Sequence, residues 1–266
     1  MKKLLAVLLA VSMLFAFAAC GGDKSATDAE YITEKGKLVI GYTLFAPMNF
    51  EDDNKQLTGF ETEFAKAVCE KLGLEAEFRL ISWAAKETEL NSKNIDCIWN
   101  GMTINEERLA AFSISTPYMA NKQVLVVKAE NAAKYTTADA LEGANIVAEQ
   151  ESAGEEVAKT DAFFAKANYK SVETQADALL QVKSGYADGC VVDYVCSIGM
   201  IGEGTDYADL VVVDELAFAD EQYGIAFRKD SDITAKVNDA ITELVNDGTL
   251  MKIAEKYKLQ DQIIAK

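Results

Sequence analysis

No histidine occurs among the 266 residues of this chain. Its absence excludes the Ser-His and Cys-His pairs that activate nucleophiles, and it excludes zinc sites built on histidine. The sequence also lacks a Gly-x-x-x-x-Gly-Lys phosphate loop, a Gly-x-Gly-x-x-Gly dinucleotide turn and an aspartate-rich calcium loop. We therefore expect no metal and no cofactor, while acid–base catalysis by carboxylates stays open.

Basic residues are few, because 26 lysines and arginines stand against 43 aspartates and glutamates, for a net charge of −17. Such a chain repels phosphate backbones and anionic lipid headgroups, so contacts with nucleic acid are not expected. The acidity favours solubility, and it does not identify a ligand.

One long apolar run extends from Leu4 to Ala19 and is interrupted only by Ser12. It is too short for a comfortable membrane span, and it follows the basic start Met1-Lys2-Lys3. We interpret residues 1–19 as a signal peptide that is removed on export.

Cys20 leaves two ways of processing that leader open. It follows Phe17-Ala18-Ala19, which matches the cleavage box of bacterial lipoproteins except that leucine is usual at the position of Phe17. The favoured prediction is a lipoprotein, exported and held on the outer face of the bacterial cell membrane by acylation of Cys20, including palmitate. A plain secretory signal that leaves Cys20 free is the alternative. Residues 20–30 are mostly small and polar, as expected of a short tether.

Four further cysteines, Cys69, Cys97, Cys190 and Cys196, are enough for two disulfides in an exported protein. Cys97 and Cys190, however, lie within apolar strand-like runs, where a free cysteine packs as a small core residue. Buried free thiols are the favoured prediction, and disulfide bonding is the alternative.

Strand-like and helix-like segments alternate after the tether, which is the pattern of an α/β protein. Thr58 and Glu61 have the spacing of a capping box, and Gly73 and Gly185 are placed to end helices. The expected strands are 37–41, 75–80, 95–99, 123–127, 145–148, 190–192, 210–213 and 223–227. The expected helices are 60–72, 87–92, 105–112, 155–166, 174–184, 233–247 and 250–257.

Two strand–helix series joined by apolar strand-like runs indicate two lobes. The first series has no closing segment of its own, and the C-terminal strand and helices would supply one by crossing back. The expected division is a discontinuous first lobe, 31–123 with 222–266, and a second lobe, 124–221. Periodicity alone does not establish this crossing.

Five motifs add a family resemblance: Leu57-Thr58-Gly59-Phe60-Glu61; Gly101-Met102-Thr103 through Arg108, followed by Ser115-Thr116-Pro117-Tyr118; Asp188–Asp193; Tyr223–Arg228; and Asp247-Gly248-Thr249-Leu250. Together they resemble family 3 of the bacterial extracellular solute-binding proteins, which are polar amino-acid receptors of ABC importers. The resemblance implies a two-lobed periplasmic-binding-protein-like fold of type II, with two crossover strands as a hinge. It implies a monomer that closes around a free amino acid and delivers it to an ABC-transporter permease.

The α-carboxylate of an amino acid needs a cation, and Arg108 matches the arginine that takes it in this family. A guanidinium can do so with two parallel hydrogen bonds. Thr103 matches a residue that assists with its hydroxyl and backbone N–H, and Gly101 matches a carbonyl that accepts from the ammonium. Standing alone, Arg108 could equally be a solvated helix residue paired with neighbouring acids.

The α-ammonium needs an anion, and Asp193 matches the aspartate that receives it in the family. This residue ends an apolar strand, and strand ends in α/β sheets face the cleft where ligands bind. The alternative is an ordinary acid that caps the next segment.

Phe45 and Trp83 match aromatic residues that cover the ligand side chain, with plain core packing as the alternative. Tyr42 matches a position that resembles an aspartate in receptors for basic amino acids, where it pairs with the distal cation of the ligand. A tyrosine at this position argues against a lysine or arginine ligand held in that way.

The second lobe departs from the family pattern at Gln150-Glu151-Ser152-Ala153. Ser152 matches a hydroxyl position of the carboxylate-binding turn, whereas Glu151 replaces a glycine. A glutamate pointing inward would repel the carboxylate, so Glu151 either faces water or selects an unusual ligand.

An enzyme is the main alternative, because some cyclohexadienyl and arogenate dehydratases share a similar two-lobed scaffold. An acid such as Glu149 or Glu151 with a raised pKa could then donate a proton. Asp193 and the lipoprotein leader favour capture, so no enzyme is expected. A sensor domain is disfavoured because no membrane-spanning run follows the lobes.

Overall fold

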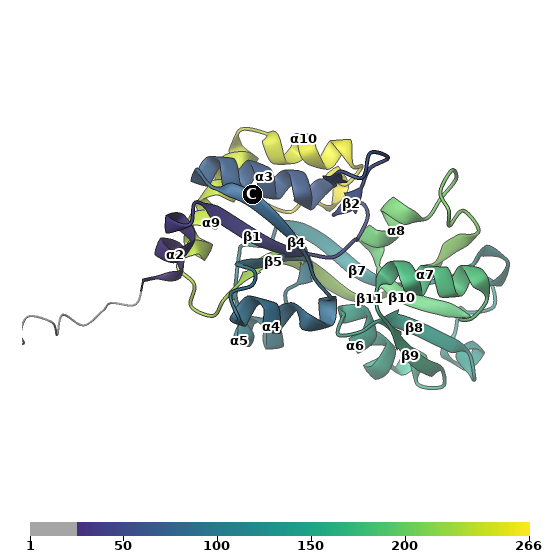
Figure 1. Cartoon of the computed structure of the whole chain (residues 1–266). Coiled ribbons are helices and arrows are strands. Elements are labelled where there is room, and N and C mark those ends of the chain that lie inside the picture. Colours follow the sequence, from purple (N-terminus) through teal and green to yellow (C-terminus); the bar gives the residue numbers. More distant parts are fainter. Residues whose placement is uncertain (1–25) are drawn as a thin grey trace, which may run out of the picture.

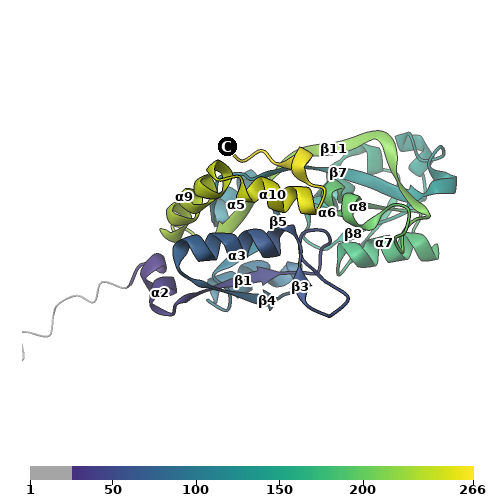
Figure 2. The same cartoon turned by 90° about the horizontal axis from the view of Figure 1, so that it is seen from above.

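The computed structural model describes residues 26–266 (Figures 1 and 2). The predicted signal peptide, residues 1–19, and the predicted lipidation site Cys20 lie outside the described residues. Two lobes lie side by side and are connected by long strands (Figure 1). Across residues 26–266, no helix combines the length and apolar character needed to cross a membrane.

A mixed sheet with the strand order β4-β1-β5-β11-β7-β10-β8-β9 continues through both lobes. In the first lobe β1 (Lys37–Tyr42) lies parallel to β4 (Glu75–Leu80) and β5 (Cys97–Thr103). In the second lobe β8 (Asn145–Glu149) lies parallel to β9 (Asn168–Val172) and β10 (Gly189–Asp193). The short strands are β2 (Phe50–Glu51), β3 (Leu57–Thr58) and β6 (Ser113–Ile114).

Two long strands connect the lobes. β7 (Met119–Lys128) and β11 (Leu210–Phe227) pair antiparallel with one another, β11 also pairs with β5, and β7 also pairs with β10. The chain therefore enters the second lobe along β7 and returns along β11. The structure thus has the expected α/β fold with two crossover strands.

Helices cover the sheet on its outer faces (Figures 1 and 2). The first lobe carries α2 (Asp28–Glu34), α3 (Phe60–Leu72), α4 (Lys86–Asn91), α5 (Glu106–Ala111), α9 (Ile233–Asn246) and α10 (Thr249–Lys256). The second lobe carries α6 (Ala153–Thr160), α7 (Gln175–Ser184) and α8 (Tyr194–Met200). The C-terminal helices α9 and α10 pack on α3, so the end of the chain completes the first lobe.

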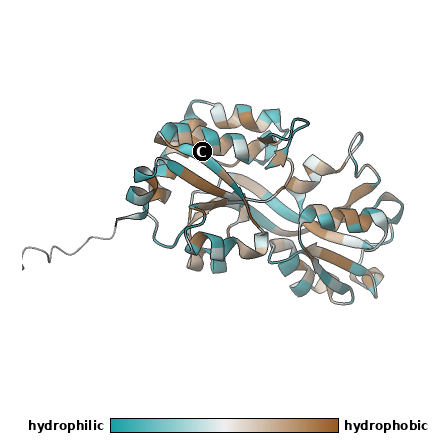
Figure 3. Cartoon of the chain, in the orientation of Figure 1, coloured by the Kyte–Doolittle hydropathy of each residue, from teal (hydrophilic) through white to brown (hydrophobic). Residues whose placement is uncertain are grey.

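The core follows from the apolar strands. Every residue of β5 and of β10 is buried, as expected for parallel strands that are covered on both faces. Figure 3 shows hydrophobic residues along these inner strands and hydrophilic residues over much of the outer helical surface.

Helix ends agree with the sequence at several points and differ at one. Gly73 and Gly185 end α3 and α7 in the left-handed conformation, as predicted. The capping box expected at Thr58 is wrong, because Gly59 is the N-cap of α3 and no side chain caps this end. Its expected partner, Glu61, is instead buried and binds other groups.

Besides the two-residue strands β2, β3 and β6, one further strand and two α-helices were not expected. Helix α2 begins at Asp28, inside the segment interpreted as tether, and Thr27 and Glu30 form a capping box there. Strand β9 is largely exposed and polar, so its residues gave no apolar signal. Helix α8 directly follows β10, and its apolar residues extend the apolar pattern of that strand. The helix predicted at 155–166 is correspondingly shorter and ends at Thr160.

All four cysteines of the described region are free and buried, which confirms the favoured prediction. They are Cys69, Cys97, Cys190 and Cys196. The alternative with two disulfides among them is therefore wrong.

Candidate functional site

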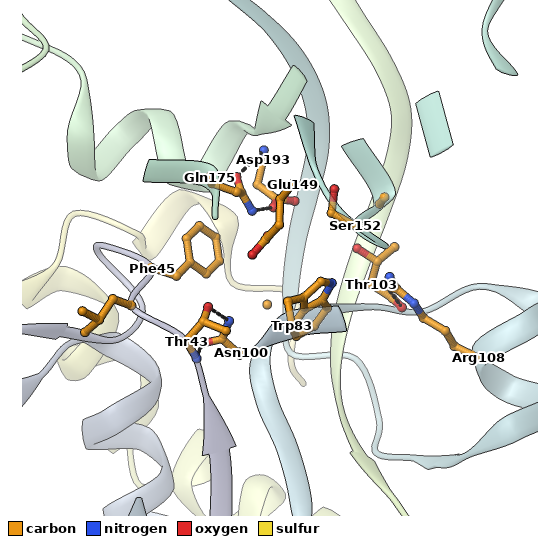
Figure 4. Close-up of a pocket in the computed structure, with 13 residues that line it drawn as sticks. Thr43, Phe45, Trp83, Asn100, Thr103, Arg108, Glu149, Ser152, Gln175 and Asp193 are labelled. Carbon is orange, nitrogen blue, oxygen red and sulfur yellow. Dashed lines mark hydrogen bonds between the residues drawn. The ribbon is translucent and has the colours of Figure 1, made fainter. Parts of the chain in front are cut away.

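A pocket lies between the two lobes, where strands from both lobes end (Figure 4). Its walls come from the segment after β1, from β5 and α5 of the first lobe, and from the ends of β8 and β10 of the second lobe. The lining residues are Thr43, Leu44, Phe45, Trp83, Asn100, Gly101, Thr103, Arg108, Glu149, Ser152, Ala153, Gln175 and Asp193. Carboxyl ends of parallel strands are where α/β proteins bind their ligands.

The enclosed space is about 10 Å³, roughly the room that one water molecule needs. The lobes are thus closed and the lining side chains fill the site. A solute the size of an amino acid enters only when the lobes separate or these side chains move.

Arg108 lies in the pocket wall and is only 9% exposed. The Asn105 side chain caps α5 by accepting from the Arg108 backbone N–H at 2.8 Å, which fixes the start of this helix. The Nη1 atom donates to the Thr103 carbonyl at 2.9 Å. Across residues 26–266 the other guanidinium N–H groups donate no hydrogen bond, so they are free for a ligand carboxylate. Burial lowers the pKa of Arg108, and the charge of Glu221 opposes this change.

Asp193 ends β10 on the opposite wall and is 7% exposed. Its Oδ1 accepts from Asn121 Nδ2 at 2.5 Å and from Gln123 Nε2 at 2.8 Å, while Gln175 Nε2 donates to Oδ2. Burial raises the pKa of Asp193, and these amide donors act in the opposite direction. The carboxylate is therefore held in place by neutral donors before any ligand arrives.

Glu221 of β11 was not anticipated as a site residue. Its Oε2 accepts from Thr103 Oγ1 at 3.1 Å, Asn121 Nδ2 at 2.9 Å and Gln123 Nε2 at 3.0 Å. The amides of Asn121 and Gln123 also donate to Asp193, so Glu221 and Asp193 share one hydrogen-bond network. Burial and the charge of Asp193 raise the pKa of Glu221 to about 7.

Glu149, at the end of β8, is 5% exposed. Figure 4 shows its carboxyl group directed into the middle of the pocket, with Phe45 and Trp83 on either side in that view. Burial, and then the charge of Asp193, raise the pKa of Glu149 to about 8. The sequence suggested Glu149 only as a proton donor in the enzyme alternative. The signal that singled out Asp193, an acid that ends a buried strand, applies equally to Glu149.

Phe45, Trp83 and Gly101 all line the pocket as their predicted roles require, and both aromatic residues are buried. Gly101 has a φ of +57°, and a Cβ there would lie 2.6 Å from Phe45 Cε1. Glycine is therefore required at this position for conformation and for space.

A buried network lies directly behind Gly101. Its backbone N–H donates to Glu61 Oε1 at 2.8 Å, and Tyr118 also donates to that oxygen. Asn49 Nδ2 donates to Glu61 Oε2 at 2.8 Å. Burial raises the pKa of Glu61 to about 7. This network sets the orientation of the Gly101 peptide facing the pocket.

Ser152 lines the pocket and caps α6, accepting from the Glu155 backbone N–H at 3.0 Å. Glu151 does not line the pocket, and its side chain is 52% exposed. Its Oε2 lies 3.6 Å from Lys86 Nζ, and its carbonyl accepts from Trp83 Nε1 at 3.1 Å. Of the two possibilities for Glu151, the structure shows the one in which the side chain faces outward.

Tyr42 is not among the residues that line the pocket, contrary to its predicted place in the site. It is the last residue of β1, and its ring meets Phe78 edge-on at 6.1 Å between centroids. Adjacent residues of an extended chain point in opposite directions, and it is Thr43 that faces the pocket, bonded to Asn100. The argument from position 42 against a basic ligand therefore no longer holds.

Comparison with known proteins gives the family. Residues 38–260 match the model of the bacterial extracellular solute-binding proteins, family 3. The L-cystine-binding protein TcyJ of Escherichia coli (strain K12) is 31% identical over 228 residues, which are 85% of this chain and 84% of that protein.

Solved structures are similar over most of their length. A mutant of the arginine-binding protein ArgBP from T. maritima superposes with a TM-score of 0.78 at 30% identity, covering 86% of this chain and 98% of that one. The ancestral amino acid-binding protein AncCDT-1, described as a precursor of cyclohexadienyl dehydratase, superposes with a TM-score of 0.76 at 33% identity and covers 85% and 97%. The two-lobed architecture, the pocket between the lobes and these matches lead to one conclusion: the chain belongs to family 3 of the bacterial extracellular solute-binding proteins.

Proposed function

We propose that this chain captures a free α-amino acid between its lobes, closes on it and presents it to the permease of an ABC importer. The single observation that carries the proposal is that Arg108 and Asp193 line one pocket from different lobes. A zwitterion placed there would pair its carboxylate with the first residue and its ammonium with the second.

The division into lobes that we propose is 31–123 with 222–266 for the first and 124–221 for the second. It is supported by the return of the chain along β11 and by the packing of α9 and α10 on α3. Only the closed form brings both charged groups to one ligand. Differential affinity for that form would drive closure about the crossover strands.

The energies are sufficient for a transport receptor. Charge-assisted hydrogen bonds contribute about 1.5–3 kcal/mol each, and a micromolar Kd corresponds to about −8 kcal/mol. Two bonds from Arg108 and at least one from Asp193 amount to about 4.5–9 kcal/mol, and aromatic cover from Phe45 and Trp83 must offset the cost of association together with the remaining contacts. Thr103, Gly101 and Ser152 would supply further polar contacts.

We also propose that the mature protein is a monomeric lipoprotein anchored through Cys20 after removal of residues 1–19. The sequence around Cys20 supports this placement at the outer face of the membrane. Replacing Cys20 by serine is expected to move the protein from the membrane fraction to the soluble exported fraction. A variant that stays with the membrane would exclude the anchor at this residue.

The function is tested by screening the twenty amino acids for an increase in melting temperature, followed by calorimetry on the best ligand. Arg108→Ala and Asp193→Ala are each expected to weaken binding by about 100-fold or more, because each removes on the order of 3 kcal/mol of contacts. Melting curves of the unliganded variants show that each is folded, because truncation leaves buried hydrogen-bonding partners unpaired and lowers the melting temperature without unfolding the protein. The exposed residues Arg79 and Asp139 give matched controls, since Arg79→Ala and Asp139→Ala make the same chemical changes away from the pocket. Retained affinity in either site variant would overturn the assignment.

A dehydratase is the second candidate, favoured by the raised pKa of Glu149, which keeps a proton on a carboxyl group in the pocket at neutral pH. Incubation with prephenate or arogenate tests it. We expect no product, because both substrates carry two carboxylates, whereas Arg108 is the one basic residue among those that line the pocket. Turnover that is lost in Glu149→Gln would establish the enzyme instead.

A further inference from the structure

The carboxyl group of Glu149 has no cationic partner in the closed protein. No salt bridge within 4.0 Å joins it to a basic group in the part of the chain that the structure describes. The Gln175 amide lies beside it and, like the charge of Lys86, lowers its pKa. The residue is buried at the end of β8, and its carboxyl group is directed into the ligand space (Figure 4). A neutral amide alone does not compensate a buried carboxylate, so this group can accept a cationic partner from a ligand.

Charge balance indicates what that partner is. Among the lining residues the ionisable groups are Arg108, Asp193 and Glu149. An α-amino acid brings one negative and one positive charge, which compensate Arg108 and Asp193 and leave Glu149 unmatched. A ligand with a neutral side chain would therefore place that side chain against Glu149 as a buried anion or as a protonated acid. A positively charged side chain would remove the imbalance.

The surroundings of Glu149 favour a cation as well. Phe45 and Trp83 flank the space into which it points (Figure 4). Aromatic faces attract ammonium and guanidinium groups, by about 0.5–2 kcal/mol each when water is excluded. Trp83 already lies near two cations of the protein, with Arg108 Cζ 5.9 Å and Lys86 Nζ 4.8 Å from its ring centroid. The wall is thus built from groups that accommodate positive charge.

We propose that the captured amino acid carries a cationic side chain, and that Glu149 is the residue that binds this cation and determines specificity. The inference rests on the proposed capture of an α-amino acid and deepens it. Lysine, ornithine and arginine have the required chemistry. Cystine also has a second ammonium, but it brings a second carboxylate, and Lys86, whose charge acts on Glu149, is engaged by Glu151. A bare cationic side chain therefore fits the pocket better than cystine.

The test compares ligands that differ in one charge. L-arginine and L-citrulline have nearly the same shape, and L-lysine, L-glutamine and L-cystine complete the panel, with Kd measured by calorimetry. Wild-type protein is expected to bind arginine or lysine at least tenfold more tightly than citrulline or glutamine. In Glu149→Gln this ratio should fall to within about threefold of unity, mainly through loss of affinity for the cationic ligands.

Glu173→Gln is the matched control, because it makes the same change at an exposed position in the second lobe. It should leave the ratio unchanged. Melting curves of the unliganded variants show whether Glu149→Gln folds, and Glu149→Asp, which keeps the charge, should retain a preference for the cationic ligand.

Each outcome has a distinct meaning. Binding of neutral amino acids with no preference for cationic ones would overturn the role of Glu149 and leave the proposed capture intact. Tighter binding of cystine than of arginine or lysine would overturn the choice of a bare cationic side chain. An arginine-to-citrulline ratio that Glu149→Gln does not change would exclude Glu149 as the specificity residue. Failure to bind any of these ligands or any of the twenty amino acids of the melting screen would overturn the proposed function itself.

Discussion

The indole Nε1 of Trp83 donates a hydrogen bond of 3.1 Å to the backbone carbonyl of Glu151, and this bond joins the two lobes. Lys86 Nζ reaches the same carbonyl at 3.4 Å. Glu151 has a φ of +57°, an uncommon conformation for a residue with a side chain, and its backbone N–H donates to Glu155 Oε2 at 2.8 Å. The turn after β8 is thereby held in a shape that presents its carbonyl to the other lobe.

Removing this contact should favour opening. Trp83→Phe keeps an aromatic ring but removes the Nε1 donor together with part of the ring system, so it removes at least about 1 kcal/mol from the closed form. We expect the ligand affinity to fall about three- to tenfold, with most of the change in the dissociation rate measured by stopped-flow fluorescence. An unchanged dissociation rate would mean that the contact does not contribute to closure.

Glu61 does not line the pocket, but we expect it to contribute to the stability of the fold. Both of its oxygens accept hydrogen bonds, from Gly101 and Tyr118 on one side and from Asn49 on the other. Glu61→Gln places an NH₂ group where one acceptor is needed, which should lower the free energy of unfolding by about 1–3 kcal/mol.

Urea denaturation measures this loss. Glu63→Gln in the same helix is the control, because Glu63 pairs with Lys256 at a partly exposed position and should cost less than about 1 kcal/mol. Equal losses in the two variants would contradict a special role for Glu61.

Stability should fall as the pH rises through neutrality. Burial raises the pKa of Glu149 to about 8 and those of Glu61 and Glu221 to about 7, whereas their ordinary value is 4.5. At a pH between the ordinary pKa and the raised pKa, each of these carboxyl groups keeps its proton in the folded protein and has lost it in the unfolded chain. The free energy of unfolding therefore decreases with increasing pH in this range. The chain has no histidine, so no other ordinary side chain titrates near pH 6.5.

Urea unfolding at pH 5.5, 6.5 and 7.5 checks this direction in the unliganded protein. Glu149→Gln cannot ionise at this position, and its slope should be shallower by up to about 1.4 kcal/mol per pH unit. Asp193, Lys86 and Asp177 also act on the pKa of Glu149, so they share in the size of the effect. Wild-type stability that is constant or increases over this range would refute the prediction.

The four buried thiols should be unreactive until the protein unfolds. Burial raises the pKa of Cys69 to about 12, and that of Cys97 rises well above its ordinary value, so almost no thiolate exists at pH 8. A chain carrying Cys20→Ser should react negligibly with Ellman's reagent when native, and it should release four equivalents in denaturant without reductant. Fewer than four would indicate oxidised cysteines.

Arg108 and Asp193, which the family resemblance singled out, both line the pocket, and their roles in binding stay predictions. Arg108 lies on a short helix capped by Asn105, and Asp193 ends a buried strand, so neither required knowledge of distant contacts. Tyr42 was misplaced because the direction of a side chain at a strand end changes with each residue. Thr43, one position further, is the residue that faces the pocket.

Other features depend on contacts that local patterns do not contain. Glu61 meets Gly101 across 40 positions, so its expected role in a capping box gave way to a buried network. Glu221 meets Thr103 across 118 positions, which requires β11 to lie beside β5. The free cysteines and the alternation of strands and helices, by contrast, were predicted from short apolar runs in the sequence, because such runs indicate which segments are buried.

The crossover strands also carry groups that bind the site acids. Asn121 and Gln123 lie on β7 and Glu221 on β11, and the two amides hold Asp193 in position. The strands that connect the lobes therefore lie directly behind the wall of the chamber, in contact with its acid. A solute that pairs with Asp193 therefore acts on groups of these strands through a single residue.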